Sequence, residues 1–274
     1  MADALRRHWP EYLMEAALLG GFMISASLFA SLLEFPGSPV HRAIPNVALR
    51  RALMGLAMGL TAIGLVYSPW GSRSGAHFNP ALTLAFYRLG KIARADALWY
   101  SAAQFAGGVA GMLVALALVP RPLAHPAVNY VATQPGPAGT GAAFLAEAAI
   151  SFGLMLAVLT VSNRPAVARW TGVCAGLLVA LYITAESPVS GMSMNPARTF
   201  GSAFVGSTWS GWWIYFTAPP LGMLVAAEAY RRWGGPRGVF CAKLYHPADV
   251  RCIFCEHRLT LRSPAPHRGE GDRG

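Results

Sequence analysis

Six long apolar stretches dominate the pattern of hydrophobic and polar positions along the chain. Each is close to the roughly 20 mostly apolar residues that a helix needs to cross a lipid bilayer. Ala, Gly and Leu dominate these stretches, and most charged residues lie between them. The pattern predicts an all-α polytopic membrane protein with six transmembrane helices. The predicted spans cover residues 12–35, 44–69, 95–119, 142–162, 167–185 and 211–233.

Two shorter apolar segments, 78–89 and 194–205, are too short to cross a bilayer. Each contains an Asn-Pro-Ala box near its start. Asn is a strong helix N-cap, and Pro is favoured at the first helical position. Irregular backbone at membrane depth is tolerated only where protein buries it or a water-filled cavity receives it. We therefore expect two re-entrant half-helices. The boxes consist of Asn79, Pro80 and Ala81, and of Asn195, Pro196 and Ala197.

The two boxes belong to an internal repeat. The segment SGAHFNPA at 74–81 recurs as SGMSMNPA at 190–197, and each copy follows two predicted spans and precedes one. Three spans per half force the halves into opposite orientations, which predicts an inverted repeat about an axis in the membrane plane. We place the repeats at about 10–119 and 141–233 within a channel domain of residues 1–233, followed by a cytoplasmic tail, 234–274.

Two half-helix starts related in this way would meet near the centre of the bilayer. Each helix N-terminus carries about half a positive elementary charge, so the pair would repel cations and hydronium. The amides of Asn79 and Asn195 have N–H groups that donate to a passing oxygen. A water that accepts both donors cannot accept from its neighbour in the file, and a proton relay would be interrupted.

Charged and polar residues inside the predicted spans have distinct expected roles. Arg198 directly follows the second box, and an intramembrane Arg usually faces a cavity or a partner. There it would supply hydrogen-bond donors and a barrier to cations. Glu15 and Glu147 lie early in the first span of each half, and we expect them, with Gln104, to accept the backbone N–H groups that precede the half-helices.

Composition and charge narrow the class of protein. Of the 274 residues, 54% are hydrophobic and 12% charged, yet the net charge is +10. Such apolar content excludes a disordered chain and a basic nucleic-acid-binding protein. Lys and Arg near span ends favour cytoplasmic N- and C-termini, although Arg50 and Arg51 at the second span run against this orientation. We expect an integral protein of the cell (inner) membrane with no nucleic-acid partner.

Around both boxes the chain resembles an aquaporin of the major intrinsic protein family. The resemblance covers residues 10 to 233 and rests on the paired boxes, Arg198 and the two span glutamates. It implies six transmembrane helices plus two re-entrant half-helices and a homotetramer with one pore per protomer. It also implies passive flux of water or another small neutral solute, without enzyme chemistry and with no cofactor required for transport.

In this family a narrow constriction sets solute size, and the resemblance assigns four residues to it. They are Met58, Ile183, Met192 and Arg198, with Gly59 as the alternative to Met58. Strict water channels commonly have Phe, His and Cys with the Arg. The ring here is more apolar, which lowers the barrier to small neutral solutes. Alternatively, the flexible Met side chains simply fill the space.

Other positions favour water. Glycerol-conducting members usually have Asp directly after the second-box Arg and a basic residue four positions further on, where this chain has Thr199 and Ala203. The pair Tyr215-Phe216 also resembles water channels. We therefore expect a water channel, with glycerol or another small uncharged solute, such as a metalloid hydroxide, as the alternative. A secondary transporter is a rival, but its coupling would need titratable groups where the boxes have Asn.

The hydrophilic tail contains Cys241-x4-His246-x5-Cys252-x2-Cys255-x-His257. Three Cys and one His at such spacing suit tetrahedral zinc. Our preferred ligands are Cys241, His246, Cys252 and Cys255, with His257 as the substitute. Reduced thiols, or acylation of Cys241 near the membrane, are the alternatives. Bound zinc would fold a small structural module, because metal binding there contributes folding free energy.

Overall fold

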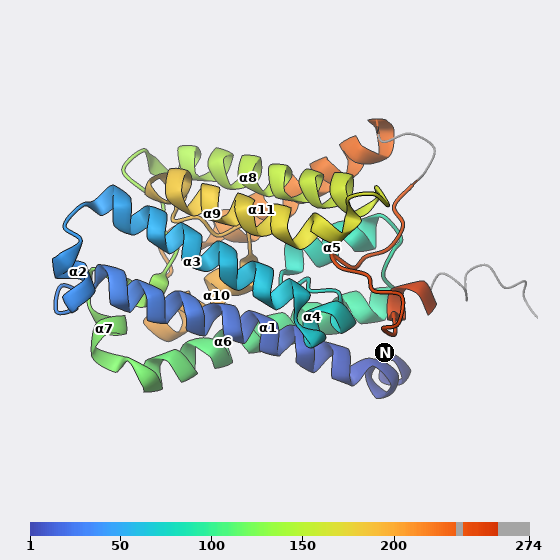
Figure 1. Ribbon diagram of the computed structural model, residues 1–274, viewed down its shortest axis with the longest axis horizontal. Helices are drawn as coiled ribbons and strands as arrows, with labels where there is room; N and C mark the ends of the chain where they lie inside the picture. The colour runs from blue at the N-terminus through green and yellow to red at the C-terminus, as the bar shows by residue number, and fades with distance from the viewer. Residues whose placement is uncertain (234–237, 257–274) are drawn as a thin grey trace, which may run out of the picture.

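The computed structural model describes residues 1–233 and 238–256, and within these ranges the regular elements are all helices. Long helices lie side by side, and two short ones enter the bundle from opposite ends (Figure 1). The elements are α1 (Ala2–Glu34), α2 (Pro39–Ala43), α3 (Val47–Tyr67), α4 (Pro69–Ser74), α5 (Pro80–Arg88), α6 (Arg94–Leu118), α7 (Pro120–Ala124), η1 (Asn129–Val131), α8 (Gly139–Ser162), η2 (Ala168–Trp170), α9 (Thr171–Ser190), α10 (Pro196–Gly206) and α11 (Trp212–Trp233).

Among the described residues, five helical segments are long and apolar enough to cross a membrane: α1, α3, α6, α8 and 168–190. The sixth long helix, α11, has 22 residues but is not among these five. Pro219 and Pro220 interrupt its middle, and Glu228 precedes two Arg in its last turns. The first span begins earlier than predicted, at Ala2, because α1 continues beyond its apolar stretch. Glu15 therefore lies well inside the helix.

The short helices α5 and α10 begin at the prolines of the two boxes. The side-chain oxygen of Asn79 accepts from the N–H of Ala81 at 2.9 Å, and that of Asn195 accepts from Ala197 at 3.0 Å. Both half-helices thus start through the Asn cap and first-turn Pro that the sequence predicts. Each starts two residues later than its apolar segment, because the residue before Asn is not helical.

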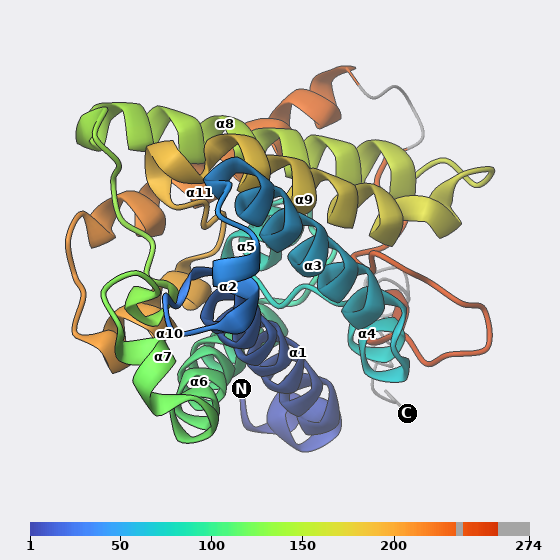
Figure 2. The same cartoon turned by 60° about the vertical axis from the view of Figure 1, so that its left-hand side comes forward.

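The long helices pair in the same way within each half. α1 packs along α6, α8 packs along α11, and α3 packs against α9 across the boundary between the halves (Figure 2). Small residues permit this contact: a Cβ at Gly107 would overlap the backbone of Ala16, and one at Gly222 would overlap that of Ala148. Such close approach is how helices associate where lipid offers no hydrophobic drive.

Residues 238–256 fold back onto the end of the bundle that carries the N-terminus, whereas α2 and α7 lie at the other end (Figure 1). This segment is not a loose appendage. Ala242, Ile253 and Phe254 are at most 4% exposed and belong to the same hydrophobic core as the long helices. The segment therefore extends the bundle at this end.

Candidate functional site

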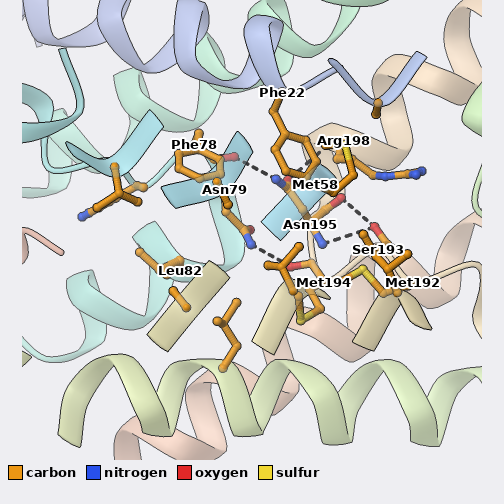
Figure 3. Close-up of a pocket in the computed structure, with 18 of the residues that line it drawn as sticks. Phe22, Met58, Phe78, Asn79, Leu82, Met192, Ser193, Met194, Asn195 and Arg198 are labelled. Carbon is orange, nitrogen blue, oxygen red and sulfur yellow. Dashed lines mark hydrogen bonds between the residues drawn. The ribbon is translucent and has the colours of Figure 1, made fainter. Parts of the chain in front are cut away.

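The two boxes meet inside the bundle and are joined by reciprocal hydrogen bonds. The side-chain nitrogen of Asn79 donates to the carbonyl of Met194 at 2.7 Å, and that of Asn195 donates to the carbonyl of Phe78 at 2.8 Å (Figure 3). An Asn amide has two N–H donors, so each box retains one donor beyond this bond. The sequence did not reveal that one N–H of each amide donates to a backbone carbonyl of the opposite half.

The backbone just before each box is held in an unusual conformation. Ala76 and Phe78 have φ of 56° and 29°, and the equivalent Met192 and Met194 have φ of 52° and 53°. A left-handed conformation costs roughly 1–2 kcal/mol for a residue with a side chain. It persists only where the surroundings determine it, and in both halves those surroundings are a buried carboxylate.

Glu15 supplies that carboxylate in the first half. One oxygen accepts from Ser74 Oγ at 2.7 Å and from the N–H of His77 at 3.0 Å. The other accepts from the N–H of Phe78 at 2.5 Å and from Gln104 Nε2 at 2.8 Å. Glu15 and Gln104 are fully buried. The carboxylate thus holds the irregular segment that leads into α5.

Glu147 makes the equivalent contacts in the second half. Its carboxylate accepts from Ser190 Oγ at 2.6 Å and from the N–H groups of Ser193 and Met194, both at 2.7 Å. The phenol of Tyr215 donates to the carbonyl of Ser190 at 2.6 Å. Tyr215 is therefore a buried support of the second box, and its resemblance to water channels says nothing direct about the solute.

A cavity of about 230 Å³ passes both boxes. Its wall is mostly apolar, and α3 contributes every fourth residue to it. Polar groups enter at Asn79, Asn195 and Arg198. The α3 residues are Met54, Met58, Ala62 and Val66.

The structure brings Met58, Ile183, Met192 and Arg198 to this one cavity. Gly59 does not line it: a Cβ there would lie 2.6 Å from the carbonyl oxygen of Gly176 on α9. The sequence reasoning missed several wall residues, and a helical spacing of four from Met58 and Ile183 could have found two of them. The missed wall residues include Met54, Ser187, Val131 and Leu244.

Arg198 lies on the first turn of α10, where its backbone N–H donates to Asn195 Oδ1 at 3.2 Å. Its guanidinium Nη1 is buried and has no hydrogen-bond partner within the described part of the chain. A buried donor without a partner is costly, and this one belongs to a residue on the cavity wall. This nitrogen therefore has a hydrogen bond left to donate.

His77 is a further polar residue on the cavity wall, and the sequence analysis did not single it out. Its Nε2 is 2.6 Å from the carbonyl of Ala242, and its Nδ1 is 3.0 Å from Thr83 Oγ1. A carbonyl only accepts, so Nε2 carries the proton. Its ring stacks on Phe254 with centroids 5.4 Å apart. His77 thus connects the first box to residues 238–256.

Residues 238–256 bring Cys241, His246, Cys252 and Cys255 together, with their ligand atoms all within 4.8 Å of one another. This arrangement could hold a metal ion. The substitute ligand, His257, lies outside the described residues. Nearby, burial lowers the pKa of the Lys243 ammonium, and the neighbouring thiols oppose that shift.

The arrangement matches a known family. A family model described as major intrinsic protein matches residues 12–230. The chain belongs to the major intrinsic protein family. Among solved structures, the aquaglyceroporin from Plasmodium falciparum superposes with a TM-score of 0.67 at 18% identity, covering 84% of this chain and 98% of that chain. The likeness shows the fold: this member of the family has the aquaporin arrangement of long helices and two half-helices.

Some curated relatives are named aquaporins, and another is named a glycerol uptake facilitator. Aquaporin NIP1-3 of Oryza sativa subsp. japonica is 37% identical over 177 residues, covering 64% of this chain and 59% of that protein. Probable aquaporin AqpM of Archaeoglobus fulgidus is 38% identical over 180 residues, covering 64% and 72%. Glycerol uptake facilitator protein-like 6 of Lactiplantibacillus plantarum is 35% identical over 184 residues, covering 66% and 84%. The match spans less than two thirds of the plant relatives.

Proposed function

We propose that this major intrinsic protein is a passive water channel, not an enzyme, whose pore is the cavity between the two boxes. The observation that carries the proposal is the convergence of Asn79, Asn195 and Arg198 on one mostly apolar cavity. Apolar walls bind water weakly. A few fixed donors replace part of the hydrogen bonds that a water molecule loses when it leaves bulk water. Flow down a gradient needs no chemical step and no cofactor.

Protons and cations would be excluded at the boxes. The N-termini of α5 and α10 both lie where the two boxes meet, and their partial positive charges add there. The remaining N–H of each Asn amide donates to the oxygen of a passing water, so that water cannot accept from its neighbours. Arg198 supplies a further positive charge on the same wall.

The constriction formed by Met58, Ile183, Met192 and Arg198 would select the solute. Three of its four side chains are apolar, which favours small neutral molecules that lose hydration readily. Thr199 stands in place of the Asp of glycerol-conducting members, and this difference favours water. The Thr199 hydroxyl lies 2.7 Å from Thr133 Oγ1 and 2.6 Å from Ser193 Oγ. Glycerol is the second candidate, supported by the apolar ring and by the relative named as a glycerol facilitator.

Osmotic shock of vesicles containing the purified full-length protein tests both solutes. With sucrose outside, we expect shrinkage several times faster than in protein-free vesicles, followed by light scattering. With glycerol outside, we expect the same shrinkage and only slow re-swelling. Fast re-swelling would make glycerol a substrate, and shrinkage at the protein-free rate both with and without a zinc chelator would remove the channel proposal. A flux that saturates with gradient would indicate a carrier.

The assembly and the membrane belong to the same proposal. We infer a homotetramer with one pore per protomer in the cell (inner) membrane, with both termini cytoplasmic. Exposed apolar side chains on the long helices, such as Leu56, Leu60 and Leu177, would face lipid or neighbouring protomers. The one metal in the proposal is a structural zinc in the tail, outside the pore. Native mass spectrometry from detergent measures the subunit number.

A further inference from the structure

Leu244 lines both the pore cavity and a second cavity. The pore cavity of about 230 Å³ and a neighbouring cavity of about 350 Å³ have lining residues that share Leu244 alone. The second cavity lies between the ends of α8 and α9 and residues 240–246. Leu244 is 5% exposed. Its side chain thus borders both cavities at the end of the bundle that carries the N-terminus.

The segment around Leu244 is fixed to the channel by specific contacts. The N–H of Leu244 donates to the carbonyl of Gly75 at 3.1 Å, in the irregular backbone ahead of the first box. Two residues earlier, the Ala242 carbonyl accepts from His77 Nε2. The ammonium of Lys243, which is 2% exposed, donates to the carbonyl of Ser72 at 2.7 Å. Three consecutive residues are therefore bound to residues 72–77, just ahead of the first box.

The four candidate metal ligands lie on both sides of this segment. Cys241 precedes Leu244 by three residues and His246 follows it by two, while Cys252 and Cys255 close the cluster from further along. A metal bound by all four would fix the backbone before and after Leu244. The position of that side chain would then depend on the metal.

The separations suit a tetrahedral ion. The Sγ atoms of Cys241 and Cys252 are 3.5 Å apart, those of Cys241 and Cys255 are 3.9 Å apart, and His246 Nε2 is 3.3 Å from Cys255 Sγ. Zinc–sulfur bonds of about 2.3 Å at tetrahedral angles place two sulfurs about 3.8 Å apart. Three Cys and one His form a common structural zinc set, and thiolate ligands disfavour Mg²⁺ and Ca²⁺.

Charge supports the same assignment. Lys243 is buried, and within the described ranges no carboxylate lies within ion-pair distance of its ammonium. A buried charge is costly unless it is compensated. Zinc with three thiolates and a neutral imidazole carries one net negative charge, so the loaded site would compensate Lys243.

We propose that Cys241, His246, Cys252 and Cys255 bind one Zn²⁺ and that the loaded site holds Leu244 across the pore, reducing flow. The metal site stands on its own geometry, whereas its effect on flow rests on the proposed water channel. Loss of zinc removes the folding free energy that orders the segment. Leu244 then leaves the wall, and the two cavities join.

Metal content of the full-length protein tests the site. Elemental analysis after purification without added metal should give one zinc per chain, and the double variant Cys252→Ser/Cys255→Ser should retain less than a tenth of that. Cys174→Ser, a thiol on α9 away from the cluster, is the matched control and should keep full zinc. Absence of zinc from the unmodified protein, or a Cys241–Cys252 disulfide found by mass spectrometry, would overturn the proposal.

Osmotic shrinkage of vesicles tests the effect on flow. Leu244→Ala keeps all four ligands, so it should keep full zinc while shrinking several times faster than the unmodified protein. Leu244→Met should match the unmodified protein. A zinc chelator should accelerate the unmodified protein and leave Leu244→Ala unchanged. Bound zinc with equal rates in all these samples would refute the closure. Rates at the protein-free level throughout, Leu244→Ala included, would instead refute the channel.

Discussion

At the scale of single residues, Arg198 has a place on the cavity wall and a buried guanidinium nitrogen that has no hydrogen-bond partner among residues 1–233 and 238–256. Replacing it with Val removes both the donor and the positive charge. We expect proton leak to rise at least several-fold while water flow changes little, because the boxes remain. A pH-sensitive dye inside vesicles under an applied potential measures the leak. Arg198→Lys keeps the charge and should stay tight; an equally tight Val variant would refute the role of charge.

We expect a replacement at Ile183 to affect glycerol flow and water flow differently. Ile183→His adds a ring and a hydrogen-bond donor to the constriction, so it should lower glycerol flow by several-fold with a smaller effect on water. Vesicle re-swelling in glycerol measures the change. Ile183→Leu keeps volume and polarity and serves as the control. Unchanged glycerol flow in the His variant would show that the constriction lies elsewhere.

At the scale of elements, each half-helix depends on one carboxylate. Glu147→Gln keeps the size of the side chain but turns one acceptor into an NH₂ that faces backbone N–H donors. An unsatisfied buried donor costs about 1–3 kcal/mol, so the unfolding temperature in detergent should fall by several degrees. Glu228→Gln, which breaks ion pairs with Arg88 and Arg231 near the surface, should cost little. Equal effects would argue against a special role for Glu147.

Much of this element-level structure is readable from sequence because its signals are local. Asn79 and Pro80 favour a helix start through local capping. The length of an apolar segment distinguishes a half-helix from a transmembrane span. The positive φ values at Ala76 and Met192 are not readable, because they result from carboxylates distant in sequence. The early start of α1 was missed because helical structure continues where apolarity ends.

At the scale of the whole molecule, the halves depend on close helix contact. Gly107→Val should prevent folding or cost at least several kcal/mol, since overpacking by even a few methyl groups costs about 1–3 kcal/mol and here the obstacle is the backbone of Ala16. The folded yield by gel filtration measures it. Gly64→Val on α3, where a Cβ meets nothing within 4 Å, is the control. A well-folded Gly107→Val protein would refute the contact.

Sequence reasoning also reached the inverted repeat and the grouping of the four candidate ligands, since both are spacing patterns. It did not predict that residues 238–256 dock against the segment ahead of the first box. That contact joins Ala242 and Leu244 to residues more than 160 positions earlier, and no local pattern encodes it. Composition instead suggested a separate hydrophilic tail, because residues 234–274 taken as a whole are basic and end in a stretch rich in Pro and Gly.

The crossed bonds between the boxes have a consequence for synthesis. Asn79 finds its acceptor at Met194, and Phe78 receives its donor from Asn195. Until the second half has been made and inserted, the first half has one donor and one acceptor without these partners. We expect that the first half alone does not form a smaller channel, because its box is completed only by a second half inserted in the opposite orientation.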